Sequence, residues 1–211
     1  MLPGIADAEG DGPFVVVEFS DLDEFYRYIT PTNAPESTHG LASGVFLDGG
    51  YGHFAFPVGE LDAIEPIAVH ELTHALMCHL PLPTWLNEGI AVNTEDALTG
   101  SWPFDMNAEQ FGKHVRFWTP DTAQEFWTGS AFSRLDEGQR LSYELARYAV
   151  QALSGDYNIF SEFVNRADFA DGGEQAAIDV YEGSLGGLLE QFFGPGDWSP
   201  RPEDWFTHDE S

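Results

Sequence analysis

The pattern of hydrophobic and polar positions predicts a short mixed segment at the start of the chain. Residues 14 to 19, FVVVEF, are β-branched and aromatic, as is typical of a strand. After Ser20, an expected helix cap, apolar side chains recur at helical spacing. Residues 31 to 43 have a loop composition, and two short apolar runs then flank the turn sequence DGG at 48 to 50. We therefore expect the order β-α-β-β for residues 13 to 60.

The rest of the chain is predicted to be mainly helical. Residues 61 to 195 carry apolar side chains at intervals of three and four, most clearly at 138 to 153. The tail from 196 to 211 holds too many prolines for a helix, and we expect its aromatic residues to dock onto the body; these are Trp198, Trp205 and Phe206. The aromatic residues between 99 and 137 are expected to be core, with a cleft wall as the alternative.

These elements predict an α+β fold in which a small β-α-β-β lobe precedes a mainly helical lobe. A chain of 211 residues with 43% hydrophobic content is long and apolar enough for one domain, which we place at 1–211. Residues 1 to 12 are rich in Gly, Asp and Ala and are expected to be disordered. They also lack the basic and apolar regions of a signal peptide, so the protein is expected to be either cytoplasmic or secreted with its leader removed.

The charge of the chain excludes one class of function. There are 36 acidic and 8 basic residues, which gives a formal net charge of −28. Such a field repels phosphate backbones, so nucleic-acid binding is not expected, and anionic membranes are disfavoured for the same reason. No run approaches the ~20 apolar residues that span a bilayer. Two readings of the acidic surface stay open: adaptation to salt, and a cationic substrate.

The candidate chemistry lies in HELTH at residues 70 to 74. On a helix, His70 and His74 lie on one face and can present two imidazole nitrogens to one ion, with Glu71 beside them. The flanking residues carry no charge, as expected for a buried helix whose costly polar groups are satisfied by a metal. The lone Cys78 follows on the same apolar stretch and is expected to fill core space. The motif predicts a zinc site that needs a third ligand from elsewhere.

Glu88 is the candidate for that third ligand. It follows His74 by 14 residues, which allows a first helix to end, turn and return as an antiparallel second helix. Pro81 and Pro83 provide the turn, and Thr84 is expected to cap the second helix. Glu88 would then lie in the first turn of that helix, facing the two histidines.

The sequence WLNEGIA at 85 to 91, together with HELTH, resembles the gluzincin metallopeptidases, especially their compact peptidase-MA-like families. This resemblance implies a zincin-like helical lobe with the metal site between the two lobes. It also implies an edge strand bordering the cleft, for which we nominate residues 51 to 56. In the family a tyrosine early in a later helix faces the zinc, and Tyr143 stands at the matching place. The alternative reading of Tyr143 is an ordinary core or surface tyrosine.

The chain also departs from related patterns. Thermolysin-like members carry an acid four residues after the ligand glutamate, where this chain has Val92. A ligating histidine usually needs its other N–H held, so the partner must be another group nearby, and the options are Asn93, Glu95 and Asp96. A metzincin would need glycine and histidine where this chain has Met77 and Leu80, which excludes that class.

These motifs predict a zinc-dependent hydrolase, most simply a peptidase acting on a peptide or protein substrate. His70, His74 and Glu88 would hold Zn²⁺, and Glu71 would act as the general base. One alternative is a non-catalytic binding module stabilised by zinc at the same ligands. Another is a regulatory metallopeptidase that cuts a repressor.

Overall fold

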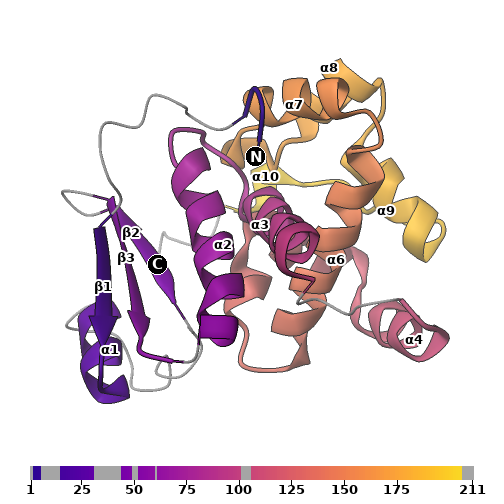
Figure 1. Ribbon diagram of the computed structural model, residues 1–211. Coiled ribbons are helices and arrows are strands. Elements are labelled where there is room, and N and C mark those ends of the chain that lie inside the picture. The colour runs from indigo at the N-terminus through magenta and orange to yellow at the C-terminus, as the bar shows by residue number, and fades with distance from the viewer. Residues whose placement is uncertain are drawn as a thin grey trace, which may run out of the picture.

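The computed structural model describes residues 2–5, 15–30, 44–48, 52–59, 61–100 and 106–205, and is mainly helical with one small sheet (Figure 1). The strands are β1 (Val15–Phe19), β2 (Val45–Asp48) and β3 (Gly52–Pro57). The longer helices are α1 (Leu22–Ile29), α2 (Leu61–Met77), α3 (Thr84–Thr99), α4 (Ala108–Phe117), α5 (Pro120–Thr128), α6 (Glu137–Leu153), α7 (Tyr157–Arg166), α8 (Glu174–Tyr181) and α9 (Leu185–Phe193). The shorter helices are the 3₁₀-helices η2 (Ser130–Ser133) and η3 (Phe169–Asp171) and the one-turn α-helix α10 (Pro202–Trp205). Helix α10 corrects the prediction that the tail has too many prolines for a helix. The predicted α+β class and the β-α-β-β order are confirmed.

The sheet has the strand order β1-β3-β2, so β3 is its central strand. It pairs in parallel with β1, where Val17 lies opposite Ala55, and in antiparallel fashion with β2, where Val45 lies opposite the same residue. The nomination of residues 51 to 56 as the edge strand is therefore wrong. The strand that borders the helical lobe is β2, because β1 takes the other side of β3.

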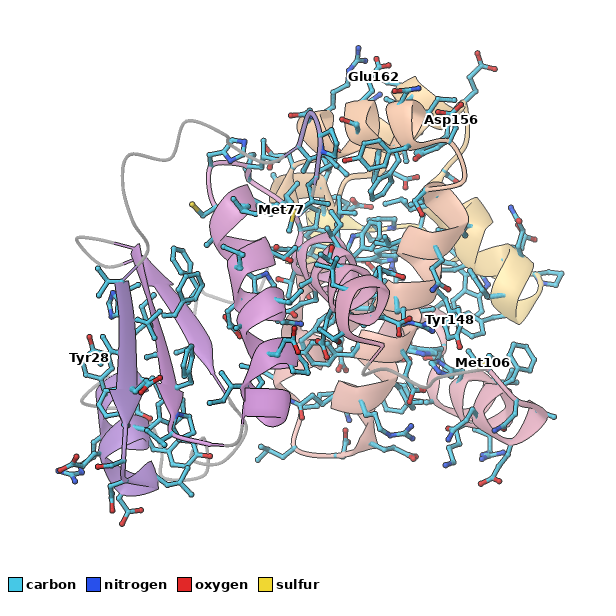
Figure 2. All side chains as sticks on the ribbon, viewed as in Figure 1. Tyr28, Met77, Met106, Tyr148, Asp156 and Glu162 are labelled. Carbon is cyan, nitrogen blue, oxygen red and sulfur yellow. The ribbon has the colours of Figure 1, made fainter. Side chains whose placement is uncertain are left out.

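Alternation along β3 directs its two faces toward different helices. Phe54 and Phe56 are buried in a cluster with Ala75 of α2. On the opposite face, His53 is buried and forms a 2.8 Å hydrogen bond with the hydroxyl of Tyr28 on α1. Figure 2 shows Tyr28 on the side of the sheet away from the helical lobe. The sheet thus lies between α1 and α2.

The helical lobe is built around α3, which packs between α2 and α6 (Figure 1). Its core contains Trp85 of α3 together with Phe126 and Trp127 of α5, all of them almost fully buried. Gly89 lies where α3 meets α6: a Cβ at this position would come within 2.6 Å of the Ala146 carbonyl oxygen. This close approach fixes the position of the N-terminal part of α3.

Most aromatic residues of the segment from 99 to 137 belong to that core, as expected. Those buried in it are Trp118, Phe126, Trp127 and Phe132, whereas Phe111 is exposed. The expectations for Trp102 and Phe104 fall outside the described residues. The cleft-wall alternative has no support, because no described aromatic residue of this segment is among those lining the cavity of the candidate site.

The prediction that Cys78 fills the core is wrong. Helix α2 ends at Met77, whose side chain is buried at the end of the helix (Figure 2), and Cys78 is exposed. The amide of Leu80 bonds back to the Met77 carbonyl in a tight turn, so the chain reverses at this point and Cys78 lies on its outer side.

Both ends of the described chain pack onto the helical lobe. The Trp198 carbonyl accepts a 2.8 Å hydrogen bond from the indole of Trp127, and the Trp205 indole bonds to Gln124, so the expected docking of these two residues is observed. Phe206 lies outside the described residues. Leu2 and Ile5 are buried in the core, which corrects the expected disorder for residues 2–5; the remaining residues up to 12 lie outside the described part.

Candidate metal centre

Two adjacent helices bring the predicted ligand residues together. His70 and His74 lie one turn apart on α2, with ring centroids 4.7 Å apart. Glu88 lies in the first turns of α3 and faces them. The predicted cap of this helix is wrong: Thr84 is its first residue, and Pro83 precedes it without a side-chain cap bond. The Pro83 carbonyl instead accepts the first bonds of the helix.

The spacing of the ligand atoms suits one small cation. The Glu88 Oε2 atom is 3.2 Å from His70 Nε2 and 3.6 Å from His74 Nε2, and the three candidate atoms all lie within 4.8 Å of one another. Tetrahedral zinc with bonds of about 2.0–2.2 Å holds its ligand atoms about 3.4 Å apart. In the described part of the chain, no other such cluster of His, Cys, Asp and Glu occurs.

The other ring nitrogen of each histidine is bound by a side chain of α3. Glu95 Oε2 lies 3.1 Å from His70 Nδ1, and Asn87 Oδ1 lies 2.9 Å from His74 Nδ1. Because a carboxylate and an amide oxygen only accept hydrogen bonds, both Nδ1 atoms donate. This directs both Nε2 atoms to Glu88 and fixes the tautomer that metal binding requires.

Of the three options for a histidine partner, the structure places only Glu95 at the site. Asn93 donates to the carbonyls of Gly89 and Arg147, and so links α3 to α6. Asp96 forms an ion pair with Arg147, 2.5 Å from its Nη2. Asn87 was not among the sequence-based options. Its position directly before Glu88 in the WLNEG motif was the available signal.

The electrostatics of the cluster favour a cation beside the carboxylate. Burial alone would lower the pKa of His70, but hydrogen bonds from its ring to Glu88 and Glu95 outweigh burial and raise it to about 10. Burial would raise the pKa of Glu88, but bonds to His70 and His74 hold it at about 2. In the chain without metal, a proton on the imidazoles balances the Glu88 charge, and a divalent cation would compete for that place.

The cluster opens onto a cavity of about 680 Å³ between β2, α2, α3 and α6. Its lining comprises Gly44, Val45, Phe46, Ile67, His70, Glu71, His74, Asn87, Glu88, Val92, Glu95, Gln139, Arg140 and Tyr143. All five sequence-predicted site residues are among them. No family model, curated protein or solved structure matches this chain.

Glu71 is held by the edge strand of the sheet. The backbone N–H of Phe46 on β2 donates a 2.7 Å hydrogen bond to Glu71 Oε2. This bond fixes one carboxylate oxygen and leaves the other able to accept. Sequence reasoning missed this contact because a backbone donor leaves no side-chain signature.

Tyr143 lies on α6 and lines the same cavity as the histidines. Its ring packs edge-on against Phe132 with centroids 5.2 Å apart. Burial, and then the charges of Glu88 and Glu71, raise the pKa of its phenol above the ordinary value. The phenol therefore stays protonated at neutral pH and can donate. No partner for its hydroxyl occurs among the residues that the structure describes.

Proposed function

We propose that the protein is a zinc-dependent hydrolase of the gluzincin type, a metallopeptidase whose active site lies between the small lobe and a zincin-like helical lobe. One observation carries the proposal. His70, His74 and Glu88 form one wall of an open cavity that also holds a carboxylate, Glu71, and a phenol, Tyr143. These are the groups that hydrolysis of an amide requires.

The donor set fits zinc. Two imidazole nitrogens and a carboxylate oxygen are the three-ligand set of many catalytic zinc sites, and both imidazoles are oriented by second hydrogen bonds. When bound there, zinc would supply a lowered pKa for water and polarise the scissile carbonyl.

Glu71 is proposed as the general base. Its carboxylate would take a proton from the attacking water and pass it to the leaving amine. The bond from Phe46 N–H orients one oxygen, so the other is the one that exchanges the proton. Tyr143 would donate a hydrogen bond to the oxyanion that develops on the carbonyl oxygen.

The edge of β2 that faces away from β3 could bind an extended substrate. In an antiparallel pair, alternate residues of an edge strand direct their N–H and C=O groups away from the sheet. Phe46 directs its N–H toward the site rather than toward β3. A peptide could add to this edge as a further strand, with its backbone beside Glu71.

The cluster favours an enzyme over a zinc-stabilised binding module. Structural zinc sites are closed by four protein ligands. The described residues supply a cluster of three, and these line an open cavity. A purely structural site also has no use for a carboxylate at Glu71.

The test is Glu71→Gln, assayed with a mixed peptide library. Glutamine keeps the side-chain shape and can accept the Phe46 N–H bond, but it cannot act as a base. We expect zinc content and fold to be retained and cleavage to fall by about 10²–10⁴-fold. Tyr143→Phe keeps the packing on Phe132 and should lose about 10²-fold or more in kcat.

Cleavage by Glu71→Gln at the wild-type rate would remove the general-base role. If the zinc-loaded wild type cleaves nothing in the library, the binding module becomes the better description.

A further inference from the structure

Arg140 is the only arginine or lysine among the residues that line the cavity. It lies on α6, one turn before Tyr143, in a protein with a net charge of −28. Among the described lining residues, the other charged ones outside the ligand set are Glu71 and Glu95. A single guanidinium therefore faces an otherwise acidic site.

A buried network holds Arg140 in place. Its Nη1 forms an ion pair with Oε1 of Glu144, one turn along α6, and Glu144 is only 1% exposed. The other oxygen of Glu144 lies 2.9 Å from Nε2 of His114, which is fully buried on α4. The indole N–H of Trp118 donates to His114 Nδ1 at 3.0 Å.

These bonds determine the charge of the network. Because Trp118 donates to Nδ1, that nitrogen carries no proton, so His114 is neutral and donates through Nε2. Glu144 then has both oxygens bound, and Arg140 is the cation that balances its charge. Loss of Arg140 would leave a buried carboxylate without a counter-charge.

The network leaves part of the guanidinium available. Nη1 bonds to Glu144 and reaches Gln110 Oε1 at 3.5 Å. No partner for Nη2 or Nε of Arg140 occurs among the described residues. The side chain is 43% exposed and lines the cavity. Two N–H donors on one edge of a guanidinium match the two oxygens of a carboxylate.

We propose that Arg140 is a specificity residue that binds a carboxylate of the substrate close to the scissile bond. The inference rests on the proposed peptidase function and names its substrate class: peptides with a carboxylate at this place. The carboxylate comes either from the chain terminus or from an Asp or Glu side chain. The selectivity runs against the overall charge of the protein, which by itself favours cationic substrates.

Matched peptides test the proposal. One pair differs only in a free or amidated C-terminus, and other pairs place Asp or Glu against Asn or Gln at each position. Binding is measured by calorimetry to zinc-loaded Glu71→Gln protein, and cleavage is measured with wild type. We expect at least one acid peptide to bind about tenfold tighter than its amide partner, and the pair that does so identifies the source of the carboxylate.

Arg140 variants in the same background decide whether this residue is responsible. Arg140→Gln should abolish the preference for acid peptides. Arg140→Lys keeps the positive charge beside Glu144 but loses the paired N–H donors of the guanidinium, so it should retain part of that preference. Arg166→Gln is the matched control, because Arg166 also pairs with a glutamate four residues away but lies on α7 and does not line the cavity. Arg166→Gln should leave the preference for acid peptides unchanged. Circular dichroism establishes whether each variant is folded. If Arg140→Gln is unfolded, the comparison of wild-type Arg140 with Arg140→Lys provides the test.

Two results would overturn the proposal: equal binding of acid and amide peptides by the parent, or a preference that persists in both Arg140 variants. The outcomes separate it from the proposed function. Cleavage by wild type without an acid preference removes the role of Arg140 and leaves the peptidase. An Arg140-dependent preference without cleavage removes the peptidase and leaves the carboxylate site.

Discussion

In the proposed zinc site, the hydrogen bonds from the histidine rings to Glu95 and Asn87 would determine how well the metal is held. Each of these side chains accepts a hydrogen bond from a histidine Nδ1–H, so the Nε2 atom of that ring stays available for an ion. The carboxylate of Glu95 also makes His70 a more basic ligand than an amide would. We expect the two residues to affect metal affinity without contacting the ion.

Replacing Glu95 by alanine should weaken zinc binding by about 10- to 100-fold, because the His70 ring loses its orientation and part of its basicity. Glu95→Gln keeps an acceptor for the ring and should lose less. Competition with a chromophoric chelator measures the affinity. Glu109→Ala, which removes a carboxylate from an ion pair on α4, is the control. Equal affinities for wild type and Glu95→Ala would mean that His70 needs no such support.

At the residue scale, the sequence predicted five of the side chains that line the cavity: His70, Glu71, His74, Glu88 and Tyr143. Spacing alone placed His70 and His74 on one face, and the two prolines before Thr84 allowed Glu88 to return to them. Asn87 was missed although it directly precedes Glu88 in WLNEG. Arg140 was missed because its contacts join α6 to α4, and no local pattern encodes them.

At the scale of elements, the packing of α3 against α6 positions Glu88. Gly89 directly follows Glu88, the proposed ligand, and a Cβ on Gly89 would meet the Ala146 carbonyl oxygen at 2.6 Å and Val150 Cγ2 at 2.7 Å. Backbone atoms of a packed helix cannot yield without moving the whole element. The glycine therefore allows the N-terminal part of α3, and Glu88 with it, to approach α6 closely.

Gly89→Ala should lower the free energy of unfolding by about 1–3 kcal/mol through overpacking, and should weaken zinc binding because α3 moves. Urea unfolding and the chelator assay measure the two effects. Gly112→Ala on α4 is the matched control, since its Cβ would meet only the flexible end of Arg116 at 3.3 Å, and alanine favours a helix by about 1 kcal/mol. A Gly89→Ala variant as stable as wild type would show that the two helices can separate at little cost.

The element that sequence reasoning placed wrongly is the edge strand. A local turn signal correctly paired β2 with β3. The parallel pairing of β1 with β3 joins segments that are separated in the sequence by α1 and β2, and nothing in the local pattern fixes which strand lies between the others. The error moved the expected substrate edge by one strand, from β3 to β2.

At the scale of the whole molecule, acidic side chains far outnumber basic ones. Six of the eight basic side chains form ion pairs with carboxylates in the described residues: Lys113, Arg134, Arg140, Arg147, Arg166 and Arg201. Most carboxylates therefore have no such partner and repel one another. Within the described residues, no helix has both the length and the apolar character of a membrane span.

Added salt should raise the thermal unfolding midpoint. Repulsion between exposed carboxylates is screened over about 10 Å at 0.1 M ionic strength and about 3 Å at 1 M. The few ion pairs weaken too, but they are outnumbered. Unfolding followed by circular dichroism from dilute buffer to molar KCl provides the measurement. A midpoint that stays flat or falls would mean that the charges lie too far apart to matter, and adaptation to salt would lose its physical basis.

The central claim is that His70, His74 and Glu88 together hold one zinc ion, and metal analysis of purified protein after zinc loading tests it most directly. Wild type should carry about one zinc per chain, Glu71→Gln should carry the same amount, and His74→Ala, shown by circular dichroism to be folded, should carry little. Equal zinc in wild type and His74→Ala, or no zinc in wild type, would contradict the account.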